Sequence, residues 1–284
     1  MKLARVGAIG AEQPVVIGDD GTAFDASSVS PDFDSGFFTS GELDQLRAML
    51  AAGELPAVDI AGQRLGSPVA TPGMLLCVGL NYRQHAIETG ADFPDEPILF
   101  MKSSRCVIGP DDPVIIPRNS TKTDWEVELA VVIGTRAHYL DSPDDAMQHI
   151  AGYCISNDVS EREFQLERGG QWVKGKSCES FNPLGPYLVT ADEVDGQNLT
   201  MQLSVNDEVR QSSTTSDMIF PIDHLVWYIS QFMVLEPGDV INTGTPAGVA
   251  MGLPGTPYLR PGDKMELTIE GLGEQRQVAL EAGR

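Results

Sequence analysis

Hydrophobic and polar positions along the chain predict many short strands and few helices. From residue 74 onward, runs rich in β-branched and apolar residues are separated by turn residues, a pattern typical of strands. Asn206-Asp207 predicts a hairpin turn before Val209. The predicted strands are Leu75–Val78, Ile98–Met101, Val114–Ile116, Trp125–Ile133, Tyr153–Ser156, Tyr187–Thr190, Met201–Val205, Asp239–Thr243 and Lys264–Ile269. We therefore expect a β-rich α+β fold without a doubly wound sheet.

Three segments carry helix signals. Ser40-Gly41-Glu42 opens a helical stripe that Gly53 ends, and Pro143 suits the first position of a second helix. The third segment ends at Pro237-Gly238. Its apolar stripe is formed by Ile222, Leu225, Val226, Ile229 and Phe232.

The pattern of strands and turns in the first 70 residues predicts a small separate unit. Leu3–Ile9 and Val15–Ile17 predict short strands, and residues 18–21, G-D-D-G, are typical of a turn between strands. Proline, serine and glycine between residues 67 and 73 interrupt the pattern. We expect a small N-terminal α+β domain at 1–70 and a catalytic domain at 71–284.

The segment T-D-W-E-V-E-L-A-V-V-I-G, residues 123–134, places carboxylates at the start of an apolar strand. Strand alternation puts Glu126 and Glu128 on one face, and Asp124 is expected to join them. Like charges at this spacing repel unless water or a cation screens them. An exposed strand face is one interpretation. The unbroken apolar run Leu129–Ile133 favours a covered strand, and hence a metal site.

Asp158 is the candidate third ligand, because it follows the predicted strand Tyr153–Ser156. Three monodentate carboxylates leave about three positions of a Mg2+ octahedron for water or substrate. By itself, Asp158 is equally consistent with a turn or a helix cap.

Several polar residues near these carboxylates are candidate substrate contacts. Arg162 and Gln165 share one face if Ser160 begins a short helix, although a charged surface helix has the same pattern. Lys176 lies in a loop flanked by glycine and could neutralise an enolate or a carboxylate; most loop lysines are only solvated. Residues 244–248, G-T-P-A-G, offer backbone N–H groups and a hydroxyl after a strand, or are simply a tight turn.

His85 and Glu88 are the candidate catalytic pair. Three positions apart on a helical turn, they can form a hydrogen bond, and a glutamate that orients a histidine makes a general base able to activate water. The spacing H-x-x-E alone is common, and most occurrences are structural.

Composition limits the class of partner and the compartment. The 284 residues include 41 acidic and 19 basic side chains, giving a formal net charge of −22, which argues against binding to nucleic acid or anionic membranes. The four cysteines form no C-x-x-C pair, so zinc-ribbon and thioredoxin-like sites are excluded. Without a long apolar stretch, we expect no signal peptide and a cytoplasmic enzyme.

Residues 74–270 resemble the fumarylacetoacetate hydrolase family. The matching pieces, in order, are V-G-L-N-Y-x-x-H-x-x-E, P-I-L-F-M-K, D-W-E-V-E-L-A-V-V-I-G, N-D-V-S-E-R-E-F-Q, Q-W-x-x-G-K, P-L-G-P and G-D-V-I-N-T-G-T-P-A-G-V. The resemblance implies a mixed β-sheet roll, a homodimer, and Mg2+ or Mn2+ held by Glu126, Glu128 and Asp158. It further implies a dyad of His85 and Glu88.

The resemblance also implies roles for the remaining candidates. Lys176 corresponds to a catalytic lysine, and the implied substrate contacts are Arg162, Gln165, Thr245 and Tyr82. The motifs are most similar to the branch that includes 2,4-diketo-3-deoxy-L-rhamnonate hydrolase. Many members have K-S-F-D-T-F after the loop lysine, whereas this chain has K-S-C-E-S-F at residues 176–181. We expect this departure to affect the pocket wall, and thus the identity of the substrate.

The expected activity is metal-dependent hydrolysis of a carbon–carbon bond in a 2,4-diketo acid, yielding pyruvate and a carboxylic acid. A diketo-deoxysugar acid is one candidate for this 2-keto acid substrate. Oxaloacetate decarboxylation, dienoate hydration and isomerisation are alternatives, because all proceed through an enolate at the metal. A non-catalytic metal-binding or ligand-binding protein is the alternative from another class, and the presence of His85 with Glu88 argues against it.

Overall fold

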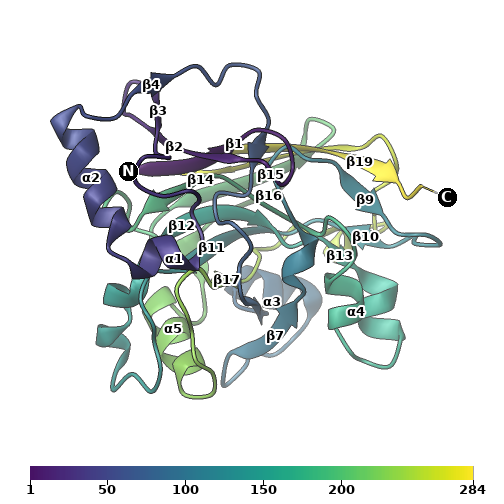
Figure 1. Ribbon diagram of the computed structural model, residues 1–284. Helices are drawn as coiled ribbons and strands as arrows, with labels where there is room; N and C mark the ends of the chain where they lie inside the picture. Colours follow the sequence, from purple (N-terminus) through teal and green to yellow (C-terminus); the bar gives the residue numbers. More distant parts are fainter. Residues whose placement is uncertain (284) are drawn as a thin grey trace.

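In the computed structural model, which describes residues 1–283, two β-sheets carry most of the chain (Figure 1). The larger sheet has the order β4 (Ala57–Val58), β3 (Ala23–Asp25), β2 (Gln13–Ile17), β1 (Lys2–Val6), β14 (Asn182–Thr190), β12 (Ile150–Asn157), β11 (Val127–Ile133), β17 (Val240–Asn242), β6 (Leu75–Gly79) and β7 (Ile98–Lys102). Two short strands, β5 (Leu65–Gly66) and β8 (Val107–Ile108), pair with β1 and β14. The second sheet has the order β16 (Glu208–Thr214), β15 (Thr200–Val205), β18 (Lys264–Ile269), β19 (Gly273–Glu281) and β9 (Val114–Ile116). A separate pair consists of β10 (Thr123–Asp124) and β13 (Ser160–Glu161). The predicted β-rich α+β fold is confirmed.

The helices are short and lie around the larger sheet (Figure 1). They are α1 (Ser35–Thr39), α2 (Glu42–Ala52), α3 (Arg83–Thr89), α4 (Val173–Lys176) and α5 (Ile222–Ser230). Residues Glu163–Glu167 form a π-helical turn. The 3-10 turns are Ser104–Cys106, Pro143–Asp145, Met147–His149, Thr215–Asp217 and Ala250–Gly252. No helix among residues 1–283 is both long and apolar enough to cross a bilayer.

Local sequence signals correctly predicted several turns and ends. Gly53 caps α2 in the left-handed region, with φ of 68°, and the Asn206-Asp207 hairpin has positive φ at both residues. The helix predicted at Pro143 is wrong, because residues 143–149 form only two 3-10 turns. A capping box is present there, but Ala146 is the only buried side chain, so there is no apolar stripe to hold a longer helix.

Central strands of the larger sheet are covered on both faces. Every residue of β11 and β12 is buried, and β14 and β12 pack against β19 and β18 of the second sheet. Gln275 on β19 donates hydrogen bonds to the carbonyl oxygens of Ile155, at 2.8 Å, and Gly185, at 2.9 Å. The exposed-face interpretation of the acidic strand is therefore wrong, and its carboxylates enter the interior.

Candidate active site

Two neighbouring strands, β11 and β12, bring the acidic residues together. Antiparallel pairing aligns Val127 with Asn157 and Glu128 with Ser156, and the N–H of Asp158 donates to the carbonyl oxygen of Glu126 at 2.9 Å. Asp158, directly after β12, therefore lies opposite Glu126, directly before β11, and Glu128 follows on the same side.

The resulting triad suits a divalent cation. Each of Glu126, Glu128 and Asp158 offers a carboxylate oxygen, these oxygens lie within 4.8 Å of one another, and all three residues are buried. Glu128 accepts one hydrogen bond through Oε2, and its Oε1 has no hydrogen-bond partner among residues 1–283. Carboxylate oxygens that lack a protein partner are the hard ligands that Mg2+ and Mn2+ prefer. The residues present therefore fit such an ion.

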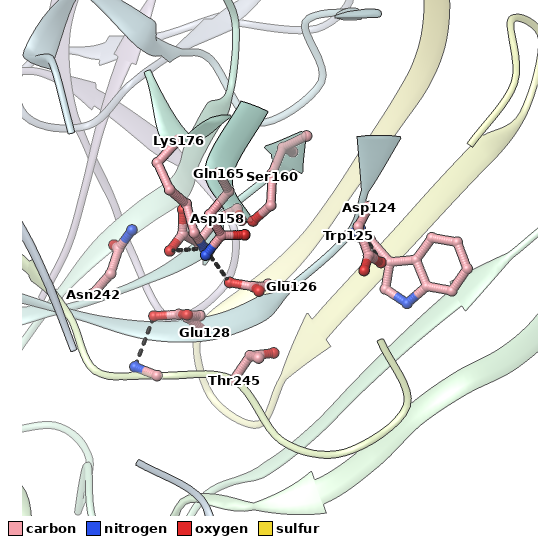
Figure 2. A network of polar contacts seen from close by, with 12 residues as sticks. Asp124, Trp125, Glu126, Glu128, Asp158, Ser160, Gln165, Lys176, Asn242 and Thr245 are labelled. Carbon is pink, nitrogen blue, oxygen red and sulfur yellow. Dashed lines mark hydrogen bonds and ion pairs between the residues drawn. The ribbon is translucent and has the colours of Figure 1, made fainter. Parts of the chain in front are cut away.

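Two buried lysines balance part of this negative charge. The Lys176 ammonium donates to Oε2 of Glu126 at 2.6 Å and to Oδ2 of Asp158 at 2.8 Å (Figure 2). Lys102, at the end of β7, reaches the other oxygen of Asp158 and donates to the carbonyl oxygen of Phe181 at 2.5 Å. Sequence reasoning placed Lys176 at the site but missed Lys102.

Asp124 does not join the triad, contrary to the sequence-based expectation. The alternation of side chains is broken, because Asp124 belongs to β10 and residues 125 and 126 lie outside both strands. Asp124 accepts hydrogen bonds from Nε of Arg162, at 2.8 Å, and from the N–H of Ala250, at 2.7 Å. Figure 2 shows it apart from the three ligand candidates.

Arg162 links Asp124 to the triad. Its Nη2 lies 2.7 Å from Oε1 of Glu126, and its Nη1 donates to Oε1 of Gln165 at 3.1 Å. The predicted shared face of Arg162 and Gln165 is thus observed, on the π-helical turn. Most of the guanidinium is engaged with protein groups, so Arg162 fixes the position of Glu126.

These contacts move the pKa values of the two glutamates in opposite directions. Burial by itself would raise the pKa of Glu126, but Lys176 and Arg162 outweigh burial and lower it to about 2. Burial, with Asp158 and Glu126 nearby, raises the pKa of Glu128 well above its usual range. Burial would lower the pKa of Lys176, but Asp158 and Glu126 raise it. The positive charge of Lys176 is therefore held at the site.

The loop at 244–248 contacts Glu128 of the carboxylate triad and also Glu88. The N–H of Gly244 donates to Oε2 of Glu128 at 2.8 Å, and the N–H of Gly248 donates to Oε1 of Glu88 at 2.9 Å. Both glycines have positive φ, 102° and 106°. A Cβ at Gly248 would lie 1.9 Å from the carbonyl oxygen of Arg210, so only glycine fits there.

His85 and Glu88 lie on α3 as the spacing predicted. Nδ1 of His85 is 3.2 Å from Oε2 of Glu88. Nε2 of His85 has no hydrogen-bond partner within the described part of the chain, and the side chain lines the same cavity as Glu126 and Glu128. An ionised Glu88 favours the proton on Nδ1, which leaves Nε2 free to accept one.

The other predicted substrate contacts differ in placement. Gln165 and Thr245 line the cavity, and the Thr245 hydroxyl donates to the carbonyl oxygen of Val127 at 3.0 Å. Tyr82 does not line it: the ring is fully buried, and its hydroxyl donates to Sδ of Met201 at 3.2 Å. Tyr82 precedes α3 directly, where its extended backbone turns the ring into the core.

The cavity has a volume of about 210 Å³, and its lining is polar in part and apolar in part. The polar part consists of residues already described. The apolar part, here termed the apolar end, is formed by Leu80, Ala91, Phe100, Leu166, Trp172 and Met251. Cys178 and Glu179, where the chain departs from the family pattern, do not line this cavity. The expected effect of that departure on the pocket wall is therefore not observed.

Comparison with known proteins identifies the family. The model described as "Fumarylacetoacetate (FAA) hydrolase C-terminal" matches residues 74–279, and the site lies within that range. The chain belongs to this family. A Burkholderia multivorans protein, named provisionally as a hydrolase, is 46% identical over 99% of this chain and 100% of its own length. Members of this enzyme family therefore share nearly the whole chain, including the first 70 residues.

Solved structures of family members share the fold. A fumarylacetoacetate hydrolase from Exiguobacterium antarcticum is 32% identical, with a TM-score of 0.86 over 99% of this chain and 100% of that one. A 2-hydroxyhepta-2,4-diene-1,7-dioate isomerase from Mycobacterium marinum is 32% identical, with a TM-score of 0.77 over both full chains. A maleylpyruvate hydrolase from Sphingobium sp. SYK-6, in complex with manganese(II) and pyruvate, is 26% identical, with a TM-score of 0.80 over both full chains. The relatives thus include hydrolases and an isomerase.

Proposed function

We propose that this protein hydrolyses the C3–C4 bond of a 2,4-diketo acid of the acylpyruvate type, giving pyruvate and a carboxylic acid. One observation carries the proposal: His85, which pairs with Glu88 and could activate water, lines the same cavity as Glu126 and Glu128 of the buried carboxylate triad. The similarity to a maleylpyruvate hydrolase that binds manganese and pyruvate supports it.

Glu126, Glu128 and Asp158 would hold Mg2+ or Mn2+. When bound, the ion would supply Lewis-acid polarisation of the 2-keto group and charge balance for the leaving enolate. Arg162 and Lys102 hold Glu126 and Asp158 in place by ion pairs from the side. These two buried cations thus hold the proposed metal ligands in position.

His85 is the proposed base. Nε2 accepts a proton from water, whose oxygen bonds to C4 of the substrate, and Glu88 keeps the imidazole in the required tautomer. The C3–C4 bond then breaks, its electron pair goes to the pyruvate enolate, and a proton returns to C3. Lys176 supplies positive charge beside the developing anion, which is worth about 3 kcal/mol for a well-placed donor.

Pyruvate release from 2,4-diketo acids tests this function. We expect activity with Mn2+ or Mg2+, loss with EDTA, and recovery when metal is returned. His85→Ala should lower kcat by about 10²- to 10⁴-fold while Mn2+ binding, measured by calorimetry, is retained. Full activity in EDTA would contradict the metal site, and full activity of His85→Ala would contradict the base. Metal binding without cleavage of any diketo acid would favour a non-catalytic protein.

Isomerisation is the second candidate, favoured by the similarity to the Mycobacterium marinum isomerase. It would use the same cavity but form no new C–O bond. A dienoate that shifts its double bond without releasing pyruvate would identify this activity. Oxaloacetate decarboxylation would be recognised by CO2 release from oxaloacetate under the same conditions.

We also propose that the protein assembles as a homodimer, as the family resemblance implies. Several large apolar side chains are exposed in the single chain, and burial between two copies would remove them from water. They include Ile87, Phe93, Tyr139 and Phe232. Light scattering on the purified protein gives the mass directly, and a single-chain mass would contradict the dimer.

A further inference from the structure

The apolar end of the cavity is built from residues that are far apart in the sequence. Phe100 of β7 and Trp172 pack edge to face, with ring centroids 5.2 Å apart. Trp172 also lies against Gly79, where an added Cβ would approach the indole Cζ3 to 2.8 Å. A glycine at the end of β6 therefore makes room for the indole, and the two rings form a fixed apolar wall.

Leu80 adds to this wall at a conformational cost. Its φ is 51°, in the left-handed region that disfavours a leucine. A glycine or asparagine would adopt this backbone more easily, yet the chain places a leucine there, with its side chain lining the cavity. The strain indicates that the apolar surface at this position serves the cavity.

The cations of the lining are already paired with protein carboxylates, and Nζ of one of them, Lys176, lies 5.1 Å from the centroid of the Phe100 ring. Among the described residues that line the cavity, the permanent cations are Arg162 and Lys176. Arg162 is bound to Asp124 and Glu126, and Lys176 is bound to Glu126 and Asp158. A second carboxylate at the apolar end would therefore find no cation that is free to pair with it.

Hydroxyl groups of a substrate would also lack partners at the apolar end. Thr89 also lines the cavity, and its hydroxyl already donates to the carbonyl oxygens of His85, at 3.0 Å, and Ala86, at 3.2 Å. Polar groups of a ligand that lose water without gaining hydrogen bonds reduce its binding.

We infer that the acyl group of the substrate is uncharged and apolar, an aliphatic or aryl chain rather than a dicarboxylic or polyhydroxylated one. This inference rests on the proposed function, because it places the diketo acid head at the triad and the acyl group against Phe100, Trp172 and Leu80. It departs from the deoxysugar acid that the sequence motifs suggested.

Substrates of matched length test the inference on the Mn2+-loaded enzyme. We expect kcat/KM for 2,4-dioxooctanoate to exceed that for 2,4-dioxooctanedioate and for 5,6-dihydroxy-2,4-dioxooctanoate by at least about tenfold. Equal or faster cleavage of the dicarboxylic or hydroxylated substrate would overturn the inference and leave the proposed function intact.

If no diketo acid is cleaved, the proposed function fails, and the inference is then judged by binding. Calorimetric titration of the same three compounds into the Mn2+-loaded protein should give the tightest Kd for 2,4-dioxooctanoate. Equal or tighter binding of the other two would overturn the inference.

Two variants test the apolar end directly. Leu166→Arg places a cation in the lining at a side chain that is 45% exposed, and should raise kcat/KM for the dioate while lowering it for 2,4-dioxooctanoate. Val173→Arg is the matched control, because Val173 is 47% exposed and lies outside the lining.

Leu80→Asn suits the left-handed backbone, and should lower kcat/KM for 2,4-dioxooctanoate several-fold with little effect on 2,4-dioxopentanoate. Unchanged selectivity in both Leu166→Arg and Leu80→Asn would overturn the assignment.

Discussion

Gly248 and Glu88 are joined by a hydrogen bond of 2.9 Å, from the backbone N–H to Oε1, while Oε2 of Glu88 faces the imidazole of His85. The glutamate is thus held from one side and orients the histidine from the other. The loop that carries Gly248 also donates from Gly244 to Glu128. One glycine-rich loop therefore contacts both the glutamate that orients the proposed base and a proposed metal ligand.

Glu88→Gln should separate the role of Glu88 in orienting His85 from its structural contact with Gly248. Glutamine retains an oxygen for the Gly248 N–H, but its NH2 group faces Nδ1 of His85 and would favour the proton on Nε2. We expect kcat to fall by about 10²-fold or more, with a change in Tm of no more than a few degrees. Unchanged kcat would show that Glu88 does not set the tautomer. Glu88→Ala, which also loses the loop contact, is the comparison and should lower Tm further.

Gly252→Ala should impair activity through Glu88. The backbone at Gly252 is compatible with alanine, but a Cβ there would lie 2.4 Å from Cδ of Glu88 and displace it. We expect a clear loss of kcat in the wild-type background and little additional loss in Glu88→Ala, because the two changes act on one contact. Independent, additive effects in a double-mutant cycle would contradict this route.

Lys102→Met should destabilise the fold. The ammonium is fully buried and paired with Asp158, and removing one partner of a buried ion pair costs about 3–5 kcal/mol. The free energy of unfolding in urea, measured without metal, checks this. Lys174→Met is the control, because Lys174 is exposed, and it should change stability by less than about 0.5 kcal/mol. Equal stability of Lys102→Met and wild type would refute the role of the pair.

Metal binding should stabilise the protein more at high pH than at low pH. Because burial raises the pKa of Glu128 in the folded protein, the metal-free fold binds this proton more tightly than the unfolded chain does. Its contribution to stability is therefore lost as pH rises above 4.5, the ordinary pKa of a glutamate. A divalent cation favours the carboxylate and offsets that loss.

Thermal unfolding at about pH 5 and pH 8, with and without Mn2+, measures this linkage. The rise in Tm caused by Mn2+ should be larger at the higher pH, by about 2–4 °C for each pKa unit of proton competition. In Glu128→Gln the difference between the two pH values should shrink. A rise in Tm that does not depend on pH would contradict a raised pKa.

The sequence predicted the proposed metal ligands better than the residues that surround them. The three carboxylates could be grouped, because strand alternation and the order of the motifs are read directly from the sequence. They are Glu126, Glu128 and Asp158. Lys102 was missed although it ends the motif P-I-L-F-M-K, where a charged residue after an apolar strand is itself a signal. Strand alternation places it on the same face as Phe100, which lines the cavity.

Errors arose where long-range pairing decides the outcome. Asp124 leaves the triad because β10 pairs with β13, a register that no local pattern gives. Tyr82 is turned into the core by its contact with Met201, which lies far along the chain. The apolar end of the cavity likewise depends on Gly79, Phe100 and Trp172 meeting from separate segments.

The pairing of β1 with β14 has a practical consequence for shortened versions of the protein. Leu3 lies opposite Leu188, and Lys2 opposite Val189, so the first strand covers the outer hydrogen-bonding edge of β14. A fragment that starts after residue 70 would expose that edge, together with apolar side chains that it now shields. Such an open edge recruits strands from other molecules, so the trimmed fragment should aggregate even though every proposed ligand and catalytic side chain is still present.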